Sequence, residues 1–110
     1  MNKVQFKQLI DSNNGTVIFK FTATWCNPCK KAAPIIDEYK NKLPNGFIFY
    51  EIDIDESIEV YAMLKSKKIV AGIPSIVAYY DDNDSFWPDE CVSSSSSHDI
   101  GIFFNTIINH

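Results

Sequence analysis

The chain has 110 residues, 45% hydrophobic and 14% aromatic, and we expect a single domain over residues 1–110 with a sizeable core. Its ten basic residues are all lysines, and 14 acidic residues bring the net charge to −4. A negative charge and the absence of arginine argue against binding to nucleic acid or to an anionic membrane surface.

No apolar run approaches the roughly 20 residues that a membrane helix needs. The first ten residues carry a short apolar pattern that Lys7 and Gln8 interrupt, unlike the continuous apolar stretch of a signal peptide. We therefore expect a cytoplasmic protein. Three cysteines fit no disulfide framework, so a Cys-x-x-Cys pair is expected to be catalytic or metal-binding.

Hydrophobic periodicity predicts helices and strands in the order α-β-α-β-α-β-β-α. The predicted elements are a helix over 3–12, a strand over 16–23, a helix over 26–43, a strand over 47–54, a helix over 58–68, a strand over 75–80, a weaker strand within 85–92 and a last helix from about 98. A helix joins the first two strands, which are therefore expected to be parallel. A short turn joins the last two, which are expected to be antiparallel.

The most informative stretch is "ATWCNPCK", residues 23–30, between a predicted strand and a predicted helix. Pro34 follows eight residues after the first cysteine, and "GIPS", residues 72–75, leads into a later strand. This arrangement resembles the thioredoxin family over about the whole chain. The resemblance implies an α/β thioredoxin fold with a mixed four-stranded sheet flanked by helices. Its usual N-terminal strand is expected to be missing, since the first predicted element is a helix.

The two cysteines have the spacing of a redox pair. Cys26 is expected at a helix N-terminus, where free N–H groups and the positive end of the helix dipole stabilise a thiolate, an effect long established for thioredoxins. Three-residue spacing on a helix places Cys29 on the same face, close enough to form a disulfide. We therefore expect Cys26 to attack a substrate disulfide and Cys29 to resolve the mixed disulfide.

Residues beside the cysteines are expected to bind the substrate. Trp25 offers an apolar plate, and Pro28 suits an early helical position because its missing N–H would have no partner there. By resemblance, Pro74 is the family's cis-proline facing the active site. Ile73 before it can offer backbone groups to an extended substrate.

Three positions depart from the family pattern. Asn27 replaces the usual glycine between the cysteines and is expected to be exposed. Ser93 is the nearest counterpart of a glycine that lines the substrate groove, which predicts a wetter and wider groove edge. Lys20 stands where thioredoxins usually carry a buried aspartate that helps move the proton of the second cysteine.

Lys20 lies inside the apolar run "VIFKF", where a buried lysine either pairs with an acid or loses its proton. Glu51 on the next strand is the expected partner. We expect Lys20 beneath Cys29, where it favours the thiolate if charged and can act as a base if neutral. The alternative is that Lys20 reaches water from the edge of the sheet and has no catalytic role.

The resemblance implies a thiol–disulfide oxidoreductase that reduces protein disulfides, as a monomer and without a bound cofactor. By resemblance its electron donor is a thioredoxin reductase. An oxidase or isomerase and a non-catalytic binding subunit remain alternatives. A zinc site is a further alternative, although Cys91, His98 and His110 provide no second pair with ligand spacing. Cys91 is expected to be a small buried strand residue.

Overall fold

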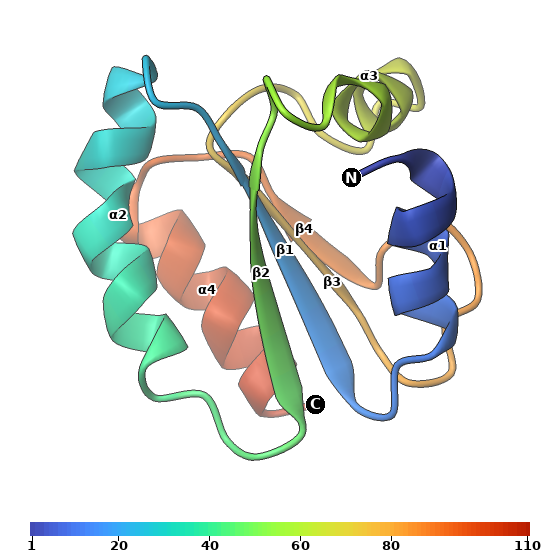
Figure 1. Ribbon diagram of the computed structural model, residues 1–110. Helices are drawn as coiled ribbons and strands as arrows, with labels where there is room; N and C mark the ends of the chain where they lie inside the picture. Colours follow the sequence, from blue (N-terminus) through green and yellow to red (C-terminus); the bar gives the residue numbers. More distant parts are fainter.

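The computed structural model describes residues 1–110 and contains the predicted elements in the predicted order (Figure 1). The helices are α1 (Lys3–Asp11), α2 (Asn27–Lys40), α3 (Ile58–Ser66) and α4 (Ser97–Ile108), and the strands are β1 (Thr16–Thr22), β2 (Phe47–Asp53), β3 (Ser75–Tyr79) and β4 (Glu90–Val92). The element boundaries agree closely with the predicted ranges, except that the last strand is short. No helix combines the length and the apolar character required to cross a bilayer.

The four strands form one mixed sheet in the order β2-β1-β3-β4. β1 pairs in parallel with β2, and β3 pairs antiparallel with both β1 and β4, which confirms the predicted directions. β1 is therefore an inner strand, and every residue of it except Thr22 is buried. This position explains why its sequence is almost continuously apolar rather than alternating.

The helices cover both faces of the sheet, α1 and α3 on one side and α2 and α4 on the other (Figure 1). Successive side chains of a strand point to opposite faces. Along β1, Val17, Phe19 and Phe21 pack in the core under α1 and α3, whereas Ile18 packs in the core under α2 and α4. The same alternation places Lys20 on the α2 side of the sheet.

Aromatic packing holds both layers against the sheet. On the first face, the Phe6 ring lies 4.5 Å from that of Phe19 and 6.0 Å from that of Tyr79 between centroids. On the second face, Tyr39 of α2 stacks on Phe104 of α4 at 4.9 Å. Full burial of one such side chain contributes roughly 1.5–3 kcal/mol. The first set of contacts holds α1 against the sheet, and the Tyr39–Phe104 stack holds α2 against α4.

Candidate active site

The two motif cysteines lie at the start of α2, shortly after the end of β1. Cys26 is the N-cap of α2, and Cys29 lies in its first turn. A disulfide joins them, and their Cα atoms are 5.3 Å apart. Both are buried, with only 4% of Cys26 and 2% of Cys29 exposed. The structure therefore brings the predicted redox pair together in its oxidised form.

The helix start provides a hydrogen bond to the first sulfur. The backbone N–H of Cys29 donates to Sγ of Cys26 across 3.2 Å. Pro28 occupies an early helical position, as expected. A backbone N–H at this position would have no partner within the helix, so the lack of one in proline costs no hydrogen bond. In the reduced protein the same N–H and the helix dipole would stabilise negative charge on Cys26. This arrangement favours Cys26 as the attacking thiolate.

The Ile73–Pro74 peptide bond is cis and faces the cysteine pair. The carbonyl oxygen of Ile73 lies 3.9 Å from Sγ of Cys26, and Ile73 packs against the small buried cluster that Ala23 forms with the two cysteines. The two segments that carry the family resemblance, far apart in sequence, therefore form one site.

A groove of about 220 Å³ runs beside this contact, lined by Pro28 and by residues 71–74 and 93–95. Ser93 Oγ accepts a hydrogen bond from the N–H of Ala71 at 3.1 Å and lies 2.7 Å from Ser75 Oγ. The Ser75 hydroxyl donates to the carbonyl oxygen of Gly72, so its oxygen must accept the Ser93 proton. Ser93 thus lines the groove as predicted, and its hydrogen bonds connect the 93–95 side of the groove to the 71–75 side.

Trp25 is 62% exposed beside the cysteine pair, as a substrate-contacting plate requires. Its indole N–H donates to Oδ2 of Asp55 at 2.8 Å, a contact that the sequence prediction missed. The sequence did contain a clue to this contact. Trp25 follows β1 and Asp55 follows β2, and neighbouring parallel strands end at the same edge of the sheet. Asn27 is exposed, as predicted, but does not line the groove.

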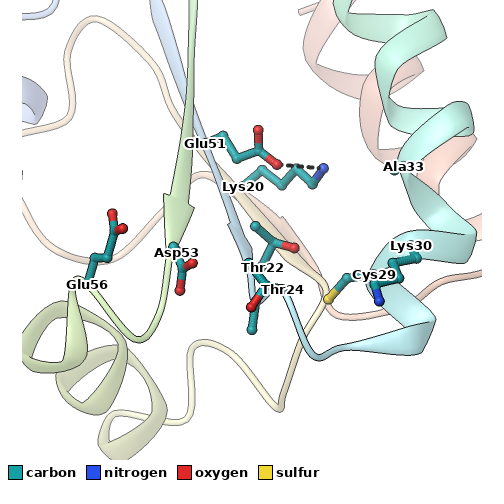
Figure 2. A pocket seen from close by; sticks show the side chains of 10 residues that line it. Lys20, Thr22, Thr24, Cys29, Lys30, Ala33, Glu51, Asp53 and Glu56 are labelled. Carbon is teal, nitrogen blue, oxygen red and sulfur yellow. Dashed lines mark hydrogen bonds and ion pairs between the residues drawn. The ribbon is translucent and has the colours of Figure 1, made fainter.

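Lys20 is buried, with 4% of its surface exposed, and its Nζ lies 3.2 Å from Oε1 of Glu51. The two residues are register partners on β1 and β2. This confirms the predicted pairing and contradicts the alternative in which Lys20 reaches water from an edge strand. Both residues line a cavity of about 450 Å³ that also contains Cys29 (Figure 2).

Cys91 departs from its prediction, because it is exposed on β4 rather than buried. β4 pairs only with β3 and is an edge strand with few covering side chains. The sulfur still lies 3.3 Å from the carbonyl oxygen of Ile69. Partial burial, followed by the charge of Glu90, raises the pKa of the Cys91 thiol. No group of three or more His, Cys, Asp or Glu side chains is placed to hold a metal ion.

Comparison with known proteins agrees with this geometry. A family model described as Thioredoxin matches residues 1–100. A thioredoxin H-type of Oryza sativa subsp. indica is 34% identical over 94 residues, which cover 86% of this chain and 67% of that protein. Thioredoxin-2 of Saccharomyces cerevisiae is 31% identical over 75 residues, covering 68% of this chain and 67% of that protein.

Solved structures share the fold at lower identity. A structure of Plasmodium falciparum thioredoxin superposes with a TM-score of 0.72 at 22% identity, covering 96% of this chain and 93% of that one. A structure of Trichomonas vaginalis thioredoxin gives a TM-score of 0.74 at 17% identity, covering 96% and 91% of the two chains. These matches support the same mixed sheet with helices on both faces.

Proposed function

This chain belongs to the thioredoxin family, and we propose that Cys26 is its attacking thiol and Cys29 its resolving thiol. It is a thiol–disulfide oxidoreductase of the thioredoxin type, with a Cys-x-x-Cys redox pair. The observation that carries the assignment of roles is the N–H of Cys29 donating to Sγ of Cys26 at the start of α2. Only Cys26 receives that bond, so the start of α2 favours the thiolate at Cys26 rather than at Cys29.

The exchange proceeds in two displacements. The Cys26 thiolate attacks one sulfur of a substrate disulfide, forms a mixed disulfide and releases one substrate thiolate. Cys29 then loses its proton and attacks the Cys26 sulfur, which releases the second substrate thiolate. The chain ends with the Cys26–Cys29 disulfide, and the substrate has gained two electrons. The disulfide in the structure corresponds to this product state.

The substrates are protein disulfides that dock in the groove beside Pro74. Backbone groups of Ile73 can pair with an extended substrate segment without reading its side chains. Trp25, Asn27 and Pro28 border the sulfur on the other side, and Ser93 gives the far wall a hydroxyl. This composition suits a polar extended segment.

A separate donor must reduce the disulfide after each turnover, and a reductase of the thioredoxin reductase type is the expected partner. The chain would act in the cytoplasm as a single-domain monomer without a cofactor of its own. Lys20 is expected to favour the Cys29 thiolate, because it places a buried positive charge in the cavity that Cys29 lines.

Turnover of a protein disulfide tests the assignment. With dithiothreitol as donor and insulin as substrate, Cys26→Ser should abolish turnover, and Cys29→Ser should stop after one mixed disulfide. Cys91→Ser is the matched control and should keep full activity. Full turnover by Cys26→Ser would overturn the assigned roles. Equilibration with glutathione buffers gives the reduction potential of the Cys26–Cys29 pair. A strongly reducing potential supports a reductase, and an oxidising one supports an enzyme that forms disulfides.

A further inference from the structure

The strand β2 has an unpaired edge. It is an outer strand of the sheet, and only β1 pairs with it (Figure 1). We propose that this edge binds the same edge of a second copy of the chain, so that the two β2 strands pair antiparallel about a twofold axis at Tyr50. The pairing goes beyond the function proposed above and does not depend on it, because each copy keeps its own Cys26–Cys29 pair.

The length and composition of β2 leave its edge open to another strand. Outer strands are usually protected from other chains by a short length, by proline or lysine, or by a bulge. β2 has seven residues, FIFYEID, with neither proline nor lysine, and it pairs with β1 in an unbroken register from Phe47 to Asp53. The outer strand on the opposite side of the sheet, β4, has only three residues. β2 is therefore the edge that can accept a partner strand.

The backbone hydrogen bonds between β1 and β2 show which groups of β2 face outward. The N–H of Ile54 donates to the carbonyl oxygen of Thr22 on β1 at 2.9 Å, so the even-numbered residues of this segment face β1. The backbone N–H and C=O groups of successive residues in a strand point to opposite sides. Phe49 and Glu51 therefore direct their backbone groups away from the sheet, and these groups have no partner within the chain.

The ends of this outward row are already hydrogen-bonded. The N–H of Phe47 donates to the turn before β2, and the carbonyl oxygen of Asp53 accepts from the turn after it. The free groups thus belong to Phe49 and Glu51, one on each side of Tyr50. A copy centred on Tyr50 places Phe49 of each chain opposite Glu51 of the other, where the two residues exchange both N–H···O bonds. A copy centred on Glu51 would instead oppose two carboxylates.

Charge complementarity favours the register centred on Tyr50. Phe49 packs in the core under α2 and α4, so alternation places the Glu51 side chain on the same side of the sheet. The ammonium group of Lys40 lies 5.2 Å from the centroid of the Phe49 ring. Glu51 of the second copy, opposite Phe49, would lie beside this ammonium group, and 55% of its side chain is exposed. The twofold axis repeats the contact, so each copy provides one cation and one carboxylate.

Apolar side chains meet on the other side of the sheet. In this register Ile48 of one copy lies opposite Ile52 of the other, and the two Tyr50 side chains lie opposite each other. These are non-hydrogen-bonded pairs, in which side chains approach most closely. Ile48 is 46% exposed in the single chain, and the pairing would cover it. A contact between two strands is small, so the pair should form at high concentration and separate on dilution into the monomer proposed above.

Sedimentation equilibrium of the reduced Cys91→Ser protein tests the association without intermolecular disulfides. Between about 10 μM and 1 mM, the range expected for a small interface, the mean mass should rise from 12.5 kDa toward twice this value. Ile48→Lys places a charge in the contact and should weaken association by about tenfold or more. Ile102→Lys is the matched control, since Ile102 is 54% exposed on α4, and it should associate like the parent.

A mass of 12.5 kDa over the whole range would overturn the proposal, and so would equal weakening in the two lysine variants. Amide hydrogen exchange gives a test that needs no substitution in β2. The amides of Phe49 and Glu51 should exchange at least about threefold more slowly at the high concentration than at the low one, because association protects them. The amides of Ile48 and Tyr50, which face β1, should not change. Equal exchange of Phe49 and Glu51 at both concentrations would exclude the edge as the contact.

Cross-linking tests the register. In a Cys26→Ser/Cys29→Ser/Cys91→Ser background, Tyr50→Cys should form a disulfide-linked dimer on oxidation with copper phenanthroline. Its two Cα atoms would be about 4.5 Å apart on the twofold axis, within the range of a disulfide. Ile48→Cys is the control, because its two copies would be offset by more than about 12 Å along the strands. Cross-linking of Ile48→Cys as fast as that of Tyr50→Cys would overturn the register.

Discussion

The indole N–H of Trp25 donates a hydrogen bond to Asp55 across 2.8 Å and joins the loop before Cys26 to the segment after β2. Trp25 is 62% exposed, so packing alone does not hold its ring. The Asp55 carboxylate therefore orients the exposed indole ring next to Cys26 in the sequence. A ring held in advance loses less side-chain entropy when a substrate binds it.

Asp55→Ala should release the Trp25 ring. Since a hydrogen bond to a charged group contributes about 1.5–3 kcal/mol, and less when exposed, kcat/KM for a protein disulfide should fall by roughly three- to tenfold. Reaction with a small aromatic disulfide should change by less than about twofold. Steady-state kinetics and the fluorescence anisotropy of Trp25 in a Trp87→Phe background measure both effects. Asp55→Asn keeps an acceptor oxygen and should stay near wild type.

Reduced protein should be alkylated first at Cys26 and much later at Cys91. The α2 N-terminus favours the Cys26 thiolate, whereas burial raises the pKa of the Cys91 thiol. A raised thiol pKa lowers the thiolate fraction at any pH below it, so Cys91 labelling should accelerate only at alkaline pH. Iodoacetamide time courses read by peptide mass spectrometry check this order. Faster labelling of Cys91 at pH 7 would contradict it.

The Ser75–Ser93 contact should contribute measurably to stability. Ser75 is fully buried, and Ser75→Ala leaves the Gly72 carbonyl and the Ser93 hydroxyl without their partner. We expect a loss of about 1–2 kcal/mol in the free energy of unfolding. Ser93→Ala should cost less, because the Ala71 N–H that it frees is exposed and can bind water. Urea unfolding of both variants measures the difference, and equal losses would contradict the assigned network.

Tyr79 should make the protein sensitive to alkaline pH. Burial raises the pKa of its phenol, followed by the charges of Cys91 and Asp89, and its hydroxyl donates to the carbonyl oxygen of Phe86 at 2.7 Å. The folded pKa exceeds the unfolded value of about 10, so this stabilisation is complete below that pH and is lost as the pH rises above it. Tyr79→Phe should reduce the fall in unfolding free energy between pH 10 and 11.5. A fall as steep as in wild type would assign it to other groups.

Lys20→Met should separate stability from redox behaviour. Replacement of a buried charged group by an apolar one of similar length is often neutral or stabilising, here by up to about 1 kcal/mol, because Glu51 remains half in water. Loss of the positive charge from the cavity that Cys29 lines should disfavour the Cys29 thiolate. The reduction potential should therefore fall, by up to about 30 mV, which corresponds to about 1.4 kcal/mol. Equilibration with glutathione buffers measures it, and a rise in potential would contradict the assigned effect of Lys20.

Local patterns were sufficient for most of the fold. The apolar run over residues 16–23 predicted β1, and the short turn between the last two strands predicted their antiparallel pairing. The Lys20–Glu51 pair was also predictable, because a lysine inside an apolar strand requires a partner on an adjacent one. Cys91 was mispredicted because strand composition does not reveal which strand lies at the edge of a sheet.

The sequence by itself determined the redox chemistry, since two cysteines three residues apart at a helix start need no distant group to form a disulfide. It also determined the alternation that divides the side chains of β1 between the two helical layers. Only the tertiary structure decided which residues surround the cysteines. Asp55 accepts a hydrogen bond from the Trp25 indole, Ser75 is hydrogen-bonded to Ser93, and Glu51 lines the same cavity as Cys29. The physical reason is that these contacts join different strands and loops, and their geometry is set by how the sheet and helices pack rather than by any local pattern.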